Sequence, residues 1–143
     1  MQIKWKRLSP QAVLPQKQTA GSAGYDLSAC LEAPLTIGPG GMEMVPLGLA
    51  SEIPQGFAGF VFSRSGLGAR GLVVAQGVGV IDSDYRGGWM VPLRNLSPQA
   101  VTVEPGQRIA QVVFLAVAEP VLAEAGDLPP TSRGLGGFGS TGG

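Results

Sequence analysis

The sequence contains no histidine and a single cysteine, Cys30. Histidine is the side chain best suited to exchange a proton near neutral pH, so acid–base chemistry in this protein must rest on other groups, carboxylates first. One cysteine cannot form a disulfide within the chain, which favours a reducing compartment. We therefore expect a cytoplasmic protein.

Charge of either sign is scarce and balanced, with 10 basic and 10 acidic residues. This balance removes the basic surface with which proteins hold a nucleic-acid backbone. No apolar run reaches the roughly 18 residues of a membrane-spanning helix. The basic start, residues 1–8, is not followed by the apolar core of a signal peptide. We expect neither nucleic acid nor membrane as a partner.

Glycine and proline are abundant instead, with 23 and 12 residues, and they divide the chain into short runs rich in Val, Ile and Phe. Such runs between turn formers are typical of strands, and no window keeps a helical apolar stripe for three turns. A chain of 143 residues can bury one self-sufficient core. We predict a single all-β domain, a jelly roll or barrel, with strands near 42–45, 57–62, 72–74, 90–93, 101–103 and 109–117.

Two segments depart from the strand pattern. A helix of one or two turns is expected after Ser65, ending at Gly71, because glycine commonly ends helices. From about Ala123 the sequence is too poor in apolar side chains to order itself. We predict a β domain at residues 1–122 and a flexible C-terminal arm at residues 123–143.

The densest chemistry lies in GVIDSDYRG, residues 79–87, where two acids, a tyrosine and an arginine interrupt an apolar pattern. Asp82 follows a Val/Ile run and is the leading candidate for a general base or a water-positioning group. If the chain stays extended, Asp82 and Asp84 share one face, and Ile81 draws Asp82 towards the interior. The alternative is a hairpin turn that uses the acids for geometry.

Three further segments could carry chemistry, although each also has an ordinary structural interpretation. In RSGLG, residues 64–68, a strand enters a turn that opens a helix, and Arg64 and Ser65 offer a guanidinium and a hydroxyl to phosphate. A capped helix with a solvated arginine is the alternative. AGSAGYDL, residues 20–27, holds Asp26, and GQRIAQ, residues 106–111, holds Gln111; taken alone, both are normal turn and strand sequences.

The arm carries one arginine and one aromatic residue among glycines, in RGLGGFG at residues 133–139. The glycine-rich segment offers no hydrophobic core into which Arg133 and Phe138 could pack. They suit a lid that closes over a ring and a phosphate, and a solubilising tail is the alternative.

Together and in this order, the five segments resemble the five motifs of the trimeric deoxyuridine triphosphatases (dUTPases) over nearly the whole chain. The resemblance implies a jelly-roll subunit in a homotrimer with shared active sites. It also implies Mg²⁺-dependent hydrolysis of dUTP to dUMP and diphosphate through attack of water on the α-phosphorus. Such an enzyme limits uracil incorporation into DNA and supplies dUMP for thymidylate synthesis.

The resemblance also implies roles for individual residues. Asp82 matches the carboxylate that orients and deprotonates the attacking water. Asp26 matches an acid that contacts the metal indirectly, through a water molecule. Tyr85 matches the ring that packs under the deoxyribose, within a hairpin that reads uracil. The other expected substrate contacts, to the phosphates, the base or the closing arm, are Arg64, Ser65, Gly66, Gln76, Gly77, Val80, Gln111, Arg133, Phe138 and Gly139.

Two positions differ from the family pattern. Ser63 stands where proline is common, and this change is expected to alter only backbone stiffness. Gln76 stands where some members carry asparagine near the base, and its longer amide could alter the contacts around uracil.

Two other functions compete with this interpretation. A dCTP deaminase, alone or combined with the hydrolase, shares the fold, but that group uses Arg-Ser-Ser and a catalytic glutamate. This chain has Arg64-Ser65-Gly66 and Asp82 instead. A non-catalytic nucleotide sensor on the same scaffold would bind without turnover and would not need a water-activating acid.

Overall fold

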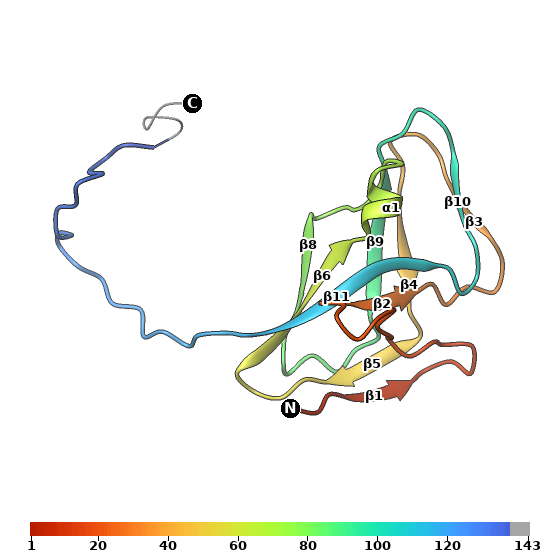
Figure 1. Ribbon diagram of the computed structural model, residues 1–143, viewed down its shortest axis with the longest axis horizontal. Coiled ribbons are helices and arrows are strands. Elements are labelled where there is room, and N and C mark those ends of the chain that lie inside the picture. The colour runs from red at the N-terminus through yellow and green to blue at the C-terminus, as the bar shows by residue number, and fades with distance from the viewer. Residues whose placement is uncertain (138–143) are drawn as a thin grey trace.

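The computed structural model describes residues 1–137 of the chain, and within them it is almost entirely β structure (Figure 1). The all-β prediction is therefore confirmed. The elements are β1 (Lys4–Arg7), β2 (Tyr25–Ser28), β3 (Leu35–Ile37), β4 (Met42–Pro46), β5 (Leu49–Glu52), β6 (Phe57–Ser63), α1 (Ser65–Gly68), β7 (Leu72–Val74), β8 (Val78–Ile81), β9 (Met90–Asn95), β10 (Val101–Val103) and β11 (Arg108–Ala116).

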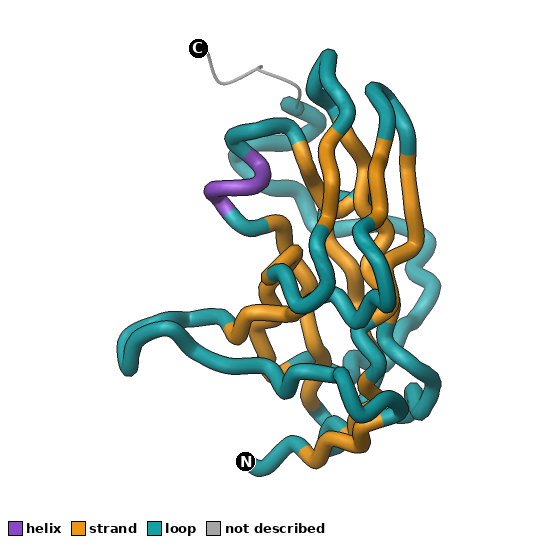
Figure 2. The backbone as a smooth tube through the Cα atoms, turned by 90° about the vertical axis from the view of Figure 1, so that its right-hand side faces the viewer, coloured by secondary structure: helices purple, strands orange, loops and turns teal. Residues whose placement is uncertain are grey.

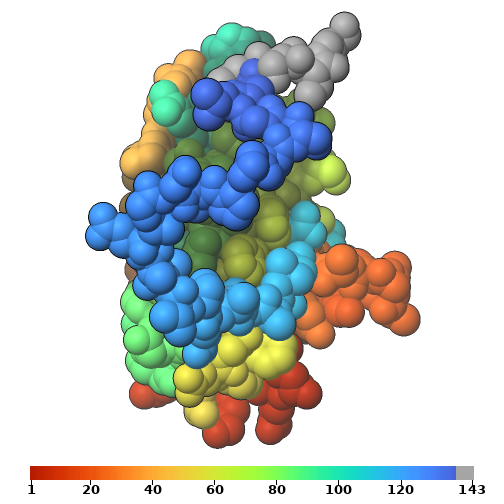
Figure 3. Space-filling view, turned by 90° about the vertical axis from the view of Figure 1, so that its left-hand side faces the viewer, coloured from red at the N-terminus to blue at the C-terminus, as the bar shows by residue number. Residues whose placement is uncertain are grey.

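Antiparallel pairing arranges the strands in four small sheets. The largest has the order β2-β11-β6-β8, the next has β4-β9-β7, and β1-β5 and β10-β3 form two-stranded pairs. Several strands that pair with each other are far apart in the sequence, as in the central β11–β6 pair. The loop before β2 projects from this framework (Figures 2 and 3).

The core is one apolar cluster between the sheets. Strand β9 shows how the sequence builds it, because its buried residues Val91, Leu93 and Asn95 alternate with more exposed ones. Trp89 lies at the base of this strand, 1% exposed, and its Nε1–H donates to the buried Ser51 Oγ at 3.1 Å. Among residues 1–137, every buried side-chain nitrogen and oxygen has a hydrogen-bond partner, which a close-packed interior requires.

The predicted elements agree with those observed, apart from their ends. Strands β7 and β10 coincide with the predicted ranges, and β6 and β9 extend beyond them. The helix is shorter than predicted: α1 ends at Gly68, and Gly71, with φ of +87°, closes the turn that follows. No helix within residues 1–137 is long and apolar enough to cross a membrane.

After β11 the chain leaves the sheets. Residues 117–137 contain no strand and extend away from the domain in Figure 1; in Figure 3 this segment passes across the face nearest the viewer. Residues 115–135 are exposed throughout. The boundary between domain and arm at residue 122 remains a prediction.

Candidate active site

The four-stranded sheet brings together segments that lie far apart in the sequence. Asp26 on β2 is opposite Gln111 on β11, and Gln111 is in turn opposite Phe62 on β6. Because β6 ends at Ser63, Arg64 follows directly at the same end of the sheet. The first, second and fourth of the predicted segments therefore meet there.

Two arginines hold the carboxylate of Asp26 at this end. Arg64 Nε lies 2.9 Å from Asp26 Oδ1, and Arg108 Nη1 lies 3.1 Å from Asp26 Oδ2. Arg64 Nη1–H also donates to the Arg108 carbonyl oxygen at 3.2 Å. Two cations around one anion leave a net positive charge, which favours an anionic ligand at this edge.

Arg108 is a member of this group that the sequence did not single out. Its only local signal is its position just after the turn that opens the fourth segment. Its pairing with Asp26, 82 residues away in the sequence, arises from the register of β2 against β11.

Gln111 is fixed from two sides. Its Nε2–H donates to the Ser63 carbonyl oxygen at 3.1 Å. Its Oε1 lies over Gly24, where a Cβ would approach that oxygen to 2.7 Å. Glycine at position 24 therefore allows the amide to reach this end of the sheet.

Ser65 and Gly66 form the start of α1 beside this group, and both are exposed. The helix has only 4 residues, so its macrodipole contributes little to anion binding. A phosphate bound at this position would therefore gain little from the helix itself. The guanidinium of Arg64 and the hydroxyl of Ser65 remain the groups that can bind one.

Asp82 does not continue a strand, so residues 82–85 adopt the turn that the sequence left open as the alternative to an extended chain. Strand β8 ends at Ile81, and the chain turns, with Tyr85 N–H donating to the Asp82 carbonyl oxygen at 3.3 Å. Asp82 is exposed rather than drawn inward. The reason is that Ile81 is the last strand residue, and the turn directs the next side chain into solvent.

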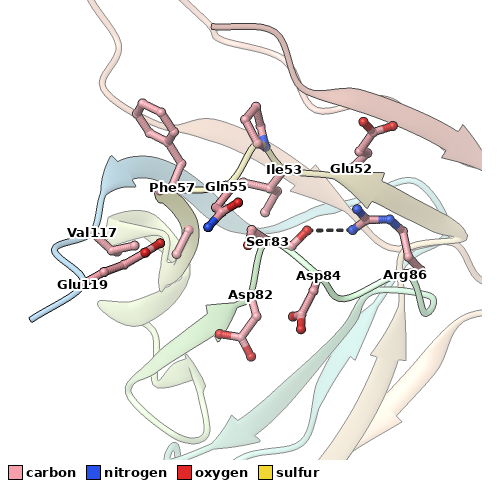
Figure 4. Close-up of a pocket in the computed structure, with 13 residues that line it drawn as sticks. Glu52, Ile53, Gln55, Phe57, Asp82, Ser83, Asp84, Arg86, Val117 and Glu119 are labelled. Atoms are coloured by element: carbon pink, nitrogen blue, oxygen red, sulfur yellow. Dashed lines mark hydrogen bonds between the residues drawn. The ribbon is translucent and has the colours of Figure 1, made fainter. Parts of the chain in front are cut away.

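Asp82 borders an open hollow of about 710 Å³ between the turn and the β5–β6 connection (Figure 4). The carboxylates of Asp82 and Asp84 extend to the same side of the turn, and Arg86 Nη1–H donates to the Ser83 carbonyl oxygen at 2.6 Å. Val117 and Glu119, at the start of the arm, line the same hollow. Among residues 1–137 no cation forms an ion pair with Asp82.

Tyr85 lies beside Asp82 at a second, smaller hollow of about 280 Å³, which Val80 also lines. Its hydroxyl donates to the Gly88 carbonyl oxygen at 3.1 Å. A Cβ at Gly87 would lie 2.4 Å from that hydroxyl, so the glycine permits the ring to fold back over the turn. The result is a positioned aromatic ring with 43% of its surface exposed.

Gln76 and Gly77 lie at the other end of β8, in the turn that enters it. Gly77 has φ of +77°, which glycine tolerates and larger residues rarely adopt. Val78 is opposite Phe62, so this turn lies near Arg64 rather than near Asp82.

The predicted residues therefore form two groups that one chain does not bring together. Ile81 is opposite Gly59 and Val78 is opposite Phe62, so β6 separates Asp82 from Arg64. At about 3.3 Å per residue the separation along the strand is about 20 Å. Arg133 lies in the exposed arm, where its Nε–H donates to the Gly136 carbonyl oxygen at 2.9 Å. Phe138 and Gly139 lie outside the described residues.

Comparison with known proteins identifies the family. A family model described as dUTPase matches residues 10–142. The chain belongs to the dUTPase family. A deoxyuridine 5'-triphosphate nucleotidohydrolase of Desulfitobacterium hafniense is 49% identical over 99% of this chain and 95% of its own length. One from Idiomarina loihiensis is 46% identical over 95% of this chain and 91% of its own length.

Solved dUTPase structures share the architecture. The Staphylococcus bacteriophage 80alpha dUTPase, solved with dUpNHpp, is 25% identical with a TM-score of 0.90, and the match covers 99% of this chain and 98% of that one. A dUTPase of phage phi11 of S. aureus, whose structure describes a structural Mg(II) ion, is 21% identical with a TM-score of 0.81, covering 90% and 99%. The predicted jelly-roll-like dUTPase fold is therefore confirmed.

Asp26 is the residue expected near a metal in this dUTPase. Its side chain is 12% exposed and both of its oxygens already face a guanidinium group. A carboxylate so engaged fits contact with a hydrated Mg²⁺ through water better than direct coordination, and Mg²⁺ commonly keeps several of its waters. No group of three or more acids, cysteines or histidines within residues 1–137 is placed to hold a metal ion.

Proposed function

We propose that this chain hydrolyses dUTP to dUMP and diphosphate. The observation that carries the proposal is the match of the whole chain, at 49% identity, to a deoxyuridine 5'-triphosphate nucleotidohydrolase. The site agrees with it, because the chain offers a cationic edge for phosphates and, separately, an exposed carboxylate beside an aromatic ring.

Asp82 acts as the acceptor of a proton from the attacking water. Its carboxylate is exposed at the edge of an open hollow and forms no ion pair within the described residues. A carboxylate with these properties can hold a water molecule by hydrogen bonds and remove its proton as the water attacks the α-phosphorus.

The cationic edge binds the phosphates. Arg64, Ser65, Gly66 and Gln111 contribute the guanidinium, the hydroxyl, an adaptable backbone and the amide, and Asp26 keeps Arg64 in place through their ion pair at 2.9 Å. Asp26 would contact a Mg²⁺ ion bound with the triphosphate through water, and that ion would supply positive charge to neutralise the phosphate oxygens.

The two turns that flank β8 select the base and the sugar. Tyr85 packs against the deoxyribose and leaves no room for a 2′-hydroxyl, while the backbone of Gln76, Gly77 and Val80 presents hydrogen-bonding groups to uracil. The fixed hydroxyl of Tyr85 supports this role, because a ring held at 3.1 Å to the Gly88 carbonyl cannot easily move aside.

The active site is assembled from more than one chain of a homotrimer. Within one chain, Asp82 and Arg64 are about 20 Å apart along the strand, and the ion pair with Asp26 turns Arg64 toward its own end of the sheet, which supports a role for the two residues in different sites. An apolar outer face on the four-stranded sheet supports assembly, since Val78 and Val80 on β8 and Leu115 on β11 are 42%, 57% and 47% exposed.

The arm completes the site. Arg133 contacts the γ-phosphate and Phe138 and Gly139 cover the uracil ring, in a closure that excludes solvent. The exposure of residues 115–135 supports this role, because the segment has no packing to lose when it moves onto a ligand.

The test is a parallel assay of diphosphate release from dUTP, dCTP, dTTP and UTP, with Mg²⁺ and with a chelator, while the nucleotide product is identified. We expect Mg²⁺-dependent conversion of dUTP to dUMP and little release from the other three. Binding of dUTP without turnover would indicate a sensor instead. Consumption of dCTP with a uracil nucleotide as product would indicate a deaminase.

A further inference from the structure

Ser63, the last residue of β6, connects three segments at the cationic edge. Its Oγ accepts a hydrogen bond from the Val74 backbone N–H at 2.8 Å. Its carbonyl oxygen accepts one from Gln111 Nε2 at 3.1 Å, and its backbone is opposite Ala110 on β11. The residue therefore contacts β7, β11 and, through the next peptide bond, Arg64.

The hydroxyl joins the phosphate-binding segment to a rigid part of the core. Val74 is 2% exposed, and β7 is paired with the well-buried strand β9. If the hydroxyl were removed, a buried N–H would lose its acceptor, and the end of β6 would shift or admit water to satisfy it. Either response moves the Ser63 carbonyl that holds Gln111 and the backbone that carries Arg64.

Replacing proline by serine at position 63 changes more than backbone stiffness, because the serine hydroxyl accepts a hydrogen bond. A proline at this position would fix the backbone dihedral φ but would offer no side-chain oxygen to Val74 N–H. This chain instead holds the end of β6 by a hydrogen bond across to β7. The expectation that serine alters only backbone stiffness is therefore wrong.

We propose that the Ser63 hydroxyl is a positioning group for phosphate binding, acting through Arg64 and Gln111. The inference rests on the proposed function for the identity of the ligand. It makes Ser63 a determinant of how tightly the phosphates bind, without contact between its side chain and the substrate.

The experiment measures binding of inorganic tripolyphosphate with Mg²⁺ by titration calorimetry, together with kcat and KM for dUTP. We expect Ser63→Ala to raise both the tripolyphosphate Kd and the KM about tenfold, the effect of one lost hydrogen bond, and to leave kcat within about twofold. Ser63→Thr, which keeps the hydroxyl, should restore both values to within about twofold of the native protein.

Ser51→Ala is the matched control. It also removes a hydroxyl that accepts a hydrogen bond in the interior, from Trp89 Nε1–H at 3.1 Å, but at a position away from the cationic edge. We expect it to lower the Tm without changing the tripolyphosphate Kd.

The proposal is overturned if Ser63→Ala binds tripolyphosphate as tightly as the native protein, or if Ser51→Ala weakens binding equally. Should the alanine variant not fold, Ser63→Cys, with a weaker acceptor of similar size, takes its place and must still raise the Kd. Native protein that binds tripolyphosphate but leaves dUTP intact would refute the proposed function while the Ser63 comparison stands.

Discussion

Replacing Asp82 with asparagine is expected to lower kcat for dUTP by about 10²- to 10⁴-fold, the usual contribution of a general base. Asparagine has nearly the same shape as aspartate, so the turn and the hollow beside it should persist, but an amide cannot accept the proton of the attacking water. Because Asp82 is exposed and outside every ion pair of the described residues, folding should not suffer. Steady-state kinetics with a parallel dUTP binding titration measure both effects.

Asp84→Asn is the matched control, because it removes the same charge from the same side of the same turn. We expect it to retain kcat within about threefold, well short of the loss expected for the general base. An equal loss in both variants would mean that the negative charge of the turn, rather than proton acceptance at Asp82, supports turnover. Normal turnover in Asp82→Asn would remove this residue from the role of base.

Ending the chain at residue 132 is expected to lower kcat/KM by about 10²-fold while the domain stays folded. The deletion removes Arg133 and every later residue, and with them the contacts proposed to close the site and align the triphosphate. The Tm should change by less than about 2 °C, because residues 115–135 are exposed and contribute no core packing. Kinetics and thermal unfolding of the shortened chain test the two statements separately.

Leu135→Ala provides the comparison within the arm. Leu135 is fully exposed, so trimming its side chain should leave kcat/KM unchanged if the arm acts through Arg133 and the residues proposed to cover the base. An unchanged kcat/KM in the truncated chain would show that the arm is a solubilising tail, the alternative that the sequence left open.

The fold class could be predicted because glycine and proline divide an apolar chain into strand-length runs. Strand β1 could not, since three of its four residues, Lys4–Arg7, are cationic and only Trp5 is apolar. It forms a strand because it pairs with β5, and that tertiary contact cannot be inferred from the local sequence.

The site was predicted residue by residue, and those local assignments remain predictions. What the sequence could not provide was the pairing: that Asp26 meets Arg108 as well as Arg64, and that Asp82 lies at the opposite end of β6. Both follow from strand register, which depends on the whole sheet. The sequence also left open whether residues 82–85 stay extended or turn, and the turn is observed because β8 ends at Ile81.

The most direct test of the account mixes two inactive proteins, Asp82→Asn and Arg64→Ala, and follows dUTP hydrolysis after their subunits exchange. If each site takes Asp82 from one chain and Arg64 from another, random one-to-one assembly gives about one quarter of the sites both native residues, and we predict about one quarter of native activity. Activity that stays at the mean of the two inactive parents would place both residues in one site of one chain and contradict the account.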